Sequence, residues 1–244
     1  MGVNAFEIIF RSSGVMAVFK RAGLPTQAPA GIDSLESHIR ASLPQGSYLA
    51  MIHRLDRAVS GVVLVAITPR AARKMSRQFE RREIEKTYLA ILEGDSRHFQ
   101  NSPGSIVEWH DTISKVENKA HAEVVPDSET DPLIRSRGKQ AFTRARLLAK
   151  SDRRMLVELS PQTGRMHQLR LQSSRRGMPI VGDSLYESRE TFGNLIDSDR
   201  DRAIALHAHW IAWNDPDTFT RCEARAAVPD FWRVIEPTLF HAIE

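Results

Sequence analysis

The chain has 244 residues, 41% of them hydrophobic, which is enough to bury a sizeable core and excludes an intrinsically disordered protein. Its formal net charge is only +4, yet 27 of its 34 basic residues are arginine, whose planar guanidinium group suits contacts with phosphates and bases. A GC-rich genome would produce the same surplus of arginine, so composition alone leaves nucleic-acid binding open.

Cysteine usage and hydropathy exclude several further classes of protein. Cys222 is the only cysteine, so an internal disulfide and a cysteine-based zinc site are both excluded. No apolar run approaches the length of a membrane span, and residues 1–14 lack the charged and apolar regions of a secretory signal. We therefore expect a cytoplasmic protein that contacts no membrane.

The first sixty residues predict a hairpin, a helix and a polar loop. Residues 7–10 and 15–19 are β-prone runs separated by a Ser-Ser-Gly turn, which indicates a hairpin. Asp33 opens a capping-box pattern, and the apolar spacing after it predicts a helix that ends before Pro44. Residues 53–61 form a polar loop in front of the next strand.

The next segment predicts a buried strand and a basic helix. Residues 62–67 are an apolar, β-branched run, as expected of a strand buried on both faces. Ala71, Met75 and Phe79 recur at helical spacing, and residues 87–92 predict the following strand. The basic side chains of this helix are Arg70, Arg73, Lys74, Arg77, Arg81 and Arg82. We expect the helix to face RNA.

The second half combines a long insert with well-patterned strands. Residues 95–139 have no sustained periodicity and predict hairpins or loops. Further strands are predicted at 142–148, 155–160 and 204–213, a helix at 165–175, and a closing helix from Phe231. These strands outnumber what a simple βαβ order needs. We therefore predict an α+β fold around a mixed, mostly antiparallel β-sheet flanked by helices and loops.

The first candidate site is the segment His53-Arg-Leu-Asp-Arg57. It places Asp56 between two arginines on the predicted polar loop, directly before the most hydrophobic strand of the chain. By itself, an Asp flanked by arginines is typical of an ordinary loop salt bridge. The longer string around it points to a more specific interpretation.

The string His53-Arg-Leu-Asp-Arg-Ala-Val-Ser-Gly-Val-Val-Leu-Val-Ala66 resembles the signature of RluA-type pseudouridine synthases, in which HRLD and a short spacer precede SG and an aliphatic run. Other segments follow in the family's order, namely Lys86-Thr-Tyr-Leu-Ala90, Gly138-Lys-Gln-Ala-Phe-Thr143, Thr163-Gly-Arg-Met-His-Gln-Leu-Arg170, Pro179-Ile-Val-Gly-Asp183 and Leu206-His-Ala208. The family's usual residues are replaced by Arg21, Met166 and Gln172. The resemblance covers nearly the whole chain.

This resemblance implies the pseudouridine synthase fold in a single catalytic domain over residues 1–244, with no separate N-terminal RNA-binding domain. It implies isomerisation of specific uridines in structured RNA, either ribosomal or transfer RNA, without a cofactor. The expected partner is RNA and not DNA, and the expected state is a monomer.

The resemblance also assigns roles to individual residues. Asp56 is the implied nucleophile, and Arg165 supplies the cation that keeps its carboxylate ionised. Tyr88 places its ring against the flipped base, with its hydroxyl near the proton lost from C5. Arg54 fills the gap that the extruded uridine leaves, and Leu169 packs on the target base.

Two alternatives remain open from the residues alone. A hydrolase could use Asp56 and His53 on a nucleoside or phosphoester, and an RNA-binding module could have lost catalysis. His207 and His209 share a strand face but have no third ligand nearby in sequence, so we expect no metal. His53 and His167 are expected to orient loops through hydrogen bonds.

Overall fold

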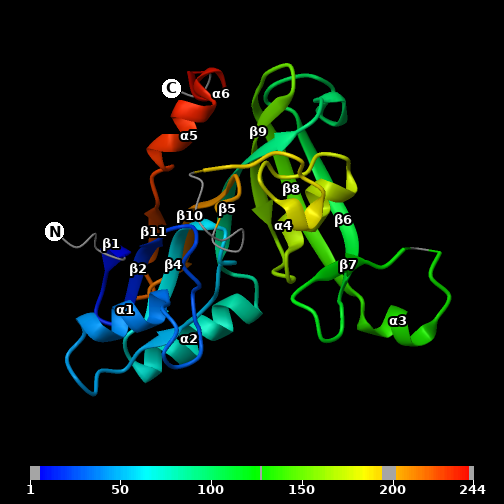
Figure 1. Ribbon diagram of the computed structural model, residues 1–244. Coiled ribbons are helices and arrows are strands. Elements are labelled where there is room, and N and C mark those ends of the chain that lie inside the picture. The colour runs from blue at the N-terminus through cyan, green and yellow to red at the C-terminus, as the bar shows by residue number, and fades with distance from the viewer. Residues whose placement is uncertain (1–5, 127, 194–201, 242–244) are drawn as a thin grey trace. The chain divides into compact units, whose positions relative to one another are not determined.

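A computed structural model describes residues 6–126, 128–193 and 202–241 (Figure 1). Its internal contacts divide the chain into two compact units, the first from residues 1–87 and 193–229, the second from residues 88–192 and 230–244. Strands of mixed direction accompanied by helices confirm the predicted α+β fold. The single catalytic domain stays a prediction.

The strands of the first unit lie in the order β1-β2-β4-β10, with β3 beside β4 and β11 beside β10. Their bounds are β1 Phe6–Arg11, β2 Val15–Lys20, β3 Ala50–Met51, β4 Ser60–Ala66, β10 Leu206–Asn214 and β11 Arg221–Arg225. β4 and β10 run parallel, and the other pairs are antiparallel. All seven residues of β4 are buried, as predicted for a strand covered on both faces.

The helix α1 (Leu35–Ser42) begins one residue later than its sequence pattern suggested. Its capping box is formed by Ser34 and Ser37, each side chain bound to the backbone amide of the other, whereas the sequence pattern placed the cap at Asp33. Either residue type can cap a helix, and the local geometry selects the second. The predicted end before Pro44 is confirmed.

The helix α2 (Pro69–Glu80) has the start that its sequence dictates. The Thr68 hydroxyl accepts a hydrogen bond from the Ala71 amide, and a proline in the first turn costs no intrahelical bond. Its apolar face buries Ala71 and Met75, and its arginines lie on the opposite side. The helices of the described residues are too short or too polar to span a lipid bilayer.

The strands of the second unit lie in the order β5-β9-β8-β6-β7, and each neighbouring pair in this order is antiparallel. Their bounds are β5 Glu85–Glu93, β6 Ile106–Lys115, β7 Ala122–Val124, β8 Lys139–Lys150 and β9 Arg154–Pro161. Two short 3-10 helices, η1 (Arg97–Phe99) and η2 (Ser184–Tyr186), and α3 (Pro132–Arg137) complete the loops. The predicted insert therefore contains a ten-residue strand, β6, whose pairing with β8 compensates for its weak periodicity.

The helices of the second unit differ from the prediction at two places. α4 (Gln168–Arg175) begins three residues later than predicted, because His167 has a φ of +52° and cannot belong to a right-handed helix. The single closing helix is instead α5 (Asp230–Ile235) and α6 (Pro237–His241). Pro237 cannot continue a helix, which explains the division.

Candidate active site

Asp56 lies half-buried on the loop between β3 and β4, where the sequence predicted a polar loop. The Thr26 hydroxyl donates to the Leu55 carbonyl at 2.8 Å and accepts from the Leu55 amide at 3.0 Å. The Val59 amide donates to the Asp56 carbonyl at 3.1 Å and closes a turn just before β4. Backbone contacts therefore fix the loop on both sides of the carboxylate.

A fully buried lysine lies next to this loop. Lys20, at the end of β2, is 0% exposed. Its ammonium donates to the carbonyls of Leu24 at 2.8 Å and Arg57 at 3.3 Å. Burial lowers the pKa of Lys20 from 10.5 to about 7, while the charge of Asp56 acts to raise it. Lys20 is thus a buried amine whose protonation changes near neutral pH, within the electrostatic reach of Asp56, and the sequence analysis did not predict this feature.

The two arginines that flank Asp56 in sequence have different surroundings. Arg57 and Gly23 are joined twice, because Arg57 Nε donates to the Gly23 carbonyl at 2.9 Å and the Gly23 amide donates to the Arg57 carbonyl at 2.9 Å. Gly23 has a φ of +85°, which residues with a side chain rarely adopt. Arg54 is exposed to solvent. Arg57 anchors the loop, whereas Arg54 can reach a ligand.

His53 fastens the start of the same loop to β4. Its Nε2 accepts a hydrogen bond from the Leu64 amide at 2.9 Å, and its ring packs against Phe79 with 5.1 Å between ring centroids. Burial, and to a lesser extent the charge of Lys86, lowers the pKa of His53 from 6.5 to about 3. His53 is therefore neutral at physiological pH and orients the loop, as expected.

Arg165 lies half-buried in the turn before α4. Its backbone amide donates to Gln168 Oε1 at 3.0 Å, and its Nε donates to the Gln140 carbonyl at 3.0 Å. The Thr163 hydroxyl donates to the same Gln168 oxygen at 2.8 Å, and Gln168 Nε2 donates to the Phe142 carbonyl at 3.0 Å. One glutamine side chain therefore shapes the turn that presents Arg165.

Two more of the predicted site residues are found in the second unit. Tyr88 is half-buried in β5 and stands opposite Leu159 of β9 in the strand register. Leu169 is 6% exposed on the first turn of α4. Tyr88, Arg165 and Leu169 thus belong to one unit and Asp56 and Arg54 to the other. Their joint action in one site stays a prediction.

A buried polar cluster behind α4 was not predicted. Gln172, which replaces the family's usual His, is 0% exposed. Its Nε2 donates to Asp111 Oδ2 at 2.9 Å, and its Oε1 accepts from the Thr143 hydroxyl at 2.6 Å. Arg176 donates to the same Asp111 oxygen at 2.8 Å. Each polar group of the amide is paired, so this departure from the family pattern is structurally accommodated.

A second buried contact joins two of the family-like segments. Arg170 binds Asp183 through two hydrogen bonds of 2.7 Å each, and both side chains are nearly inaccessible. The Tyr186 hydroxyl accepts from the Ala122 amide at 3.1 Å and bonds His167 Nδ1 at 2.9 Å. The segments around Arg170 and Asp183 were noticed for their resemblance, but their pairing has no local signal in the sequence.

The histidine pair on β10 makes hydrogen bonds to the backbone. His207 Nε2 and His209 Nδ1 lie 3.1 Å and 2.9 Å from the carbonyl of Ala226, and Ser60 Oγ lies 2.9 Å from His207 Nδ1. Across residues 6–126, 128–193 and 202–241, no three side chains of His, Cys, Asp or Glu gather as a metal site would require. These contacts give both histidines a structural role.

Comparisons with known proteins identify close similarities. Residues 14–175 match the family model described as RNA pseudouridylate synthase. An uncharacterized RNA pseudouridine synthase of Zymomonas mobilis is 35% identical over 214 residues, which is 86% of this chain and 88% of that protein. The dual-specificity RNA pseudouridine synthase RluA of Yersinia pestis is 31% identical over 229 residues, which is 89% of this chain and 98% of that protein.

A solved structure has the same fold. Human RNA pseudouridylate synthase domain containing 1 superposes with a TM-score of 0.70 at 25% sequence identity, over 94% of this chain and 86% of the human one. The structural similarity therefore extends beyond residues 14–175, which match the family model.

Proposed function

We propose that this chain, which belongs to the RNA pseudouridylate synthase family, isomerises specific uridines in structured RNA with Asp56 as its nucleophile. The chain is an RluA-type RNA pseudouridine synthase and thus an isomerase that modifies RNA. The observation that carries the role of Asp56 is its half-buried place on a loop whose backbone is held by Thr26, within the electrostatic reach of the buried amine of Lys20.

The reaction needs a group that can attack the sugar or the base, or stabilise the charge that develops there. The N1–C1′ bond of uridine breaks, the uracil ring turns, a C5–C1′ bond forms, and the proton on C5 is exchanged for one on N1. A carboxylate can attack covalently or stabilise the positive charge that develops on the sugar. The proposal includes attack by Asp56 either at C1′ or at the base.

The remaining predicted residues are assigned to steps of the same reaction. Arg165 supplies positive charge, and the turn built around Gln168 supports this role by fixing its backbone. Tyr88 stacks on the base and relays the C5 proton, while Leu169 packs on the base. Arg54 fills the gap left by the extruded uridine, a role that its solvent exposure supports.

The proposal also covers the substrate and the oligomeric state of the enzyme. We assign structured RNA, either ribosomal or transfer RNA, and not DNA. The RluA relative is named as a dual-specificity enzyme, and a relaxed choice of RNA is compatible with recognition of shape and phosphates. The enzyme acts as a cytoplasmic monomer, through a single catalytic domain and without a cofactor.

The decisive experiment uses RNA labelled with tritium at C5 of uridine, prepared from a strain that lacks this gene. The wild type should release tritium and produce pseudouridine, and Asp56→Asn should lose at least about a thousandfold of this activity because the nucleophile is gone. Asp152→Asn, a substitution at an exposed turn, is the matched control and should remain active.

Two outcomes would contradict the proposal. Unchanged tritium release by Asp56→Asn would remove Asp56 from the reaction. Release of free uracil or phosphate by the wild type would instead indicate the hydrolase that the isolated pair of Asp56 and His53 allowed.

A further inference from the structure

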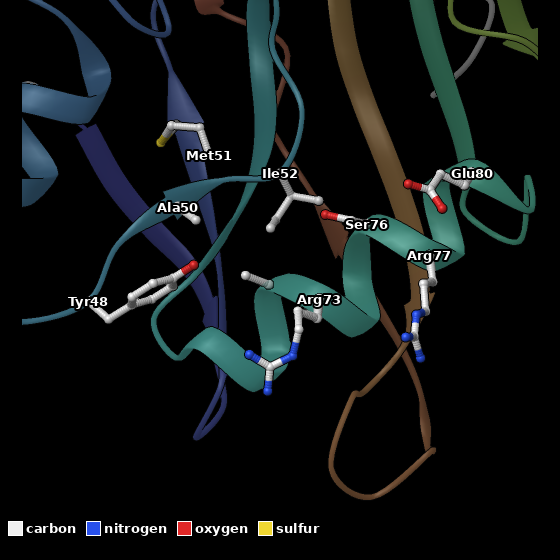
Figure 2. A pocket seen from close by; sticks show the side chains of 9 residues that line it. Tyr48, Ala50, Met51, Ile52, Arg73, Ser76, Arg77 and Glu80 are labelled. Carbon is white, nitrogen blue, oxygen red and sulfur yellow. The ribbon is translucent and has the colours of Figure 1, made fainter.

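One face of α2 in the first unit carries four basic side chains. Arg70, Arg73, Lys74 and Arg77 recur at intervals of three and four residues, which places them side by side on the helix surface. Figure 2, a view of the surface pocket that α2 forms with the segment around β3, shows Arg73 and Arg77 extending to the same side of α2, away from Glu80. These four residues form the basic face of α2.

Two side chains of the basic face have no acidic partner. Arg73 and Arg77 are exposed, and in the part of the chain that the structure describes no carboxylate lies within ion-pair distance of either guanidinium. By contrast, Arg70 pairs with Asp217 at 3.4 Å. Residues four apart are separated by about 6 Å along a helix axis, which is comparable with the spacing of neighbouring phosphates along one RNA strand. The two uncompensated charges therefore suit consecutive phosphates.

The turn between β10 and β11 is attached to one edge of the basic face. The Lys74 ammonium donates to the carbonyl of Pro216. Gln78, one helical turn further along α2, exchanges two hydrogen bonds with the backbone of Asn214, at 2.7 Å and 2.9 Å. Together with the ion pair of Asp217, these contacts hold the turn against α2.

Phe219 projects from this turn in a strained conformation. Its side chain is 72% exposed, and its φ of +60° lies in the left-handed region that large side chains rarely adopt. The turn imposes this conformation, because the Phe219 amide donates to the carbonyl of buried Asp215 at 2.9 Å. The Asp215 carboxylate also accepts from the amides of Asp217 at 2.9 Å and Thr218 at 3.0 Å. Glycine would fit here without strain, so neither packing nor turn geometry explains the phenylalanine.

The surroundings of the Phe219 ring suit a nucleobase. The Lys74 ammonium lies 4.6 Å from the ring centroid, and the exposure of the side chain leaves much of the ring accessible. Lys74 precedes Arg77 by three residues on α2, so a base on Phe219 would have its phosphates beside the unpaired arginines. An aromatic platform next to a row of positive charge is the usual design of a surface that binds single-stranded nucleic acid.

We propose that Phe219 and the basic face of α2 together bind a single-stranded segment of the RNA substrate, separate from the uridine that is modified. A base stacks on Phe219, and Arg77 and Arg73 bind phosphates of the same strand. The proposal rests on the proposed function, because it takes RNA to be the substrate. It adds a second contact that favours RNAs with an unpaired segment within reach.

The first test separates a binding role of Phe219 from a structural one. Phe219→Gly suits the left-handed conformation, so the melting temperature should not fall. Its affinity for a short RNA of alternating adenosine and cytidine, measured by fluorescence anisotropy, should drop about tenfold because the stacking contact is lost. This RNA contains no uridine, so the result does not depend on turnover.

Two variants of the full-length enzyme control this test. Phe219→Tyr should keep the affinity of the wild type, because a tyrosine ring also stacks on a base. Ile8→Ala, which removes a 44% exposed apolar side chain from β1, should bind this RNA as the wild type does. An unchanged affinity of Phe219→Gly, or a loss of affinity together with a lower melting temperature, would overturn the proposal.

The second test removes the two phosphate contacts. In Arg73→Ala/Arg77→Ala, the slope of log affinity against log salt should become shallower by about 1.4, which is about 0.7 for each single-strand phosphate contact. Arg40→Ala/Arg221→Ala is the matched control, because it removes the same charge from two arginines that already have acidic partners. It should leave the slope unchanged. An unchanged slope in the first variant, or equal changes in both, would overturn the proposal.

A contact between two copies of the chain is the alternative use of an exposed Phe219. If analytical ultracentrifugation showed a dimeric wild type and a monomeric Phe219→Gly with the same affinity for RNA, the proposal would be overturned. The proposed function can fail separately. A wild type that binds the adenosine–cytidine RNA through Phe219 but releases no tritium from uridine-labelled RNA would refute the isomerase and support this surface. Tritium release by the wild type, with unchanged RNA binding in every variant, would refute only the surface.

Discussion

The loop that carries Asp56 and the turn that carries Arg165 are held by groups of different chemistry. Around Asp56 the supports are a buried amine, Lys20, and a buried imidazole, His53, both with lowered pKa values. Around Arg165 the main support is the amide of Gln168, which carries no charge at any pH. The first region should therefore respond to pH, whereas the amide contacts of the second should not.

This difference has a physical reason in the proposed chemistry. A carboxylate that must stay charged in a half-buried place benefits from a nearby cation, and burying that cation makes its protonation sensitive to pH. An arginine is always protonated, so its surroundings only need to fix its position. Neutral amides do this without the cost of burying a further charge.

The largest expected effect comes from breaking the ion pair behind the Arg165 turn. Arg170→Met leaves the Asp183 carboxylate buried without its bidentate partner, which should lower the free energy of unfolding by about 3–5 kcal/mol. Urea unfolding monitored by circular dichroism measures this. Arg97→Met, which breaks an exposed pair with Asp95, is the control and should leave the urea midpoint in place. Equal shifts in both variants would contradict the buried role of Arg170.

The next effect concerns His53 in acid. The unfolded chain binds a proton on this residue near pH 6.5, whereas the folded protein resists protonation down to a pKa of about 3. Its contribution to stability is therefore complete above pH 6.5 and is lost as the pH falls, by at most about 1.4 kcal/mol per pH unit. Between pH 6.5 and 4, the free energy of unfolding of the wild type should fall by about 3 kcal/mol relative to that of His53→Gln. Parallel curves of stability against pH for the two proteins would show that the folded protein does not hold His53 in its neutral form.

The smallest effect concerns Lys20 in mild alkali. Its pKa is about 7 in the folded protein and 10.5 in the unfolded chain. Between these two pH values the amine is therefore protonated in the unfolded chain but largely neutral in the folded protein. Stability should therefore rise with pH, by about 2 kcal/mol between pH 7.5 and 9 relative to Lys20→Met. Calorimetric unfolding at several pH values measures the difference. If the stability curves of the wild type and Lys20→Met instead ran parallel over this range, Lys20 would bind its proton equally in the folded and unfolded states, and the contrast between the two regions would fail.

Sequence patterns with a short range determined several elements of this protein. The apolar, β-branched run before Ile67 and the threonine cap with proline before Ala71 specify β4 and α2 by interactions within a few residues. The string around Asp56 also identified the family, which the comparisons confirm. The predicted cap of α1 was wrong by one residue, because two neighbouring residues can each cap a helix. The predicted start of α4 was wrong because the left-handed backbone conformation of His167 has no clear signal in the sequence.

Tertiary structure alone decided how the two regions are supported. Thr26 reaches Leu55 across 29 positions, and Gln172 reaches Asp111 across 61, so no local period or motif links these partners. The burial of Lys20, and with it the lowered pKa, likewise appears only when the chain from Arg21 to Arg57 closes around the amine. The sequence by itself thus determined the local elements and the family, since these depend on neighbouring residues. The charges and hydrogen bonds around Asp56 and Arg165 depend on which distant groups the fold brings together and buries.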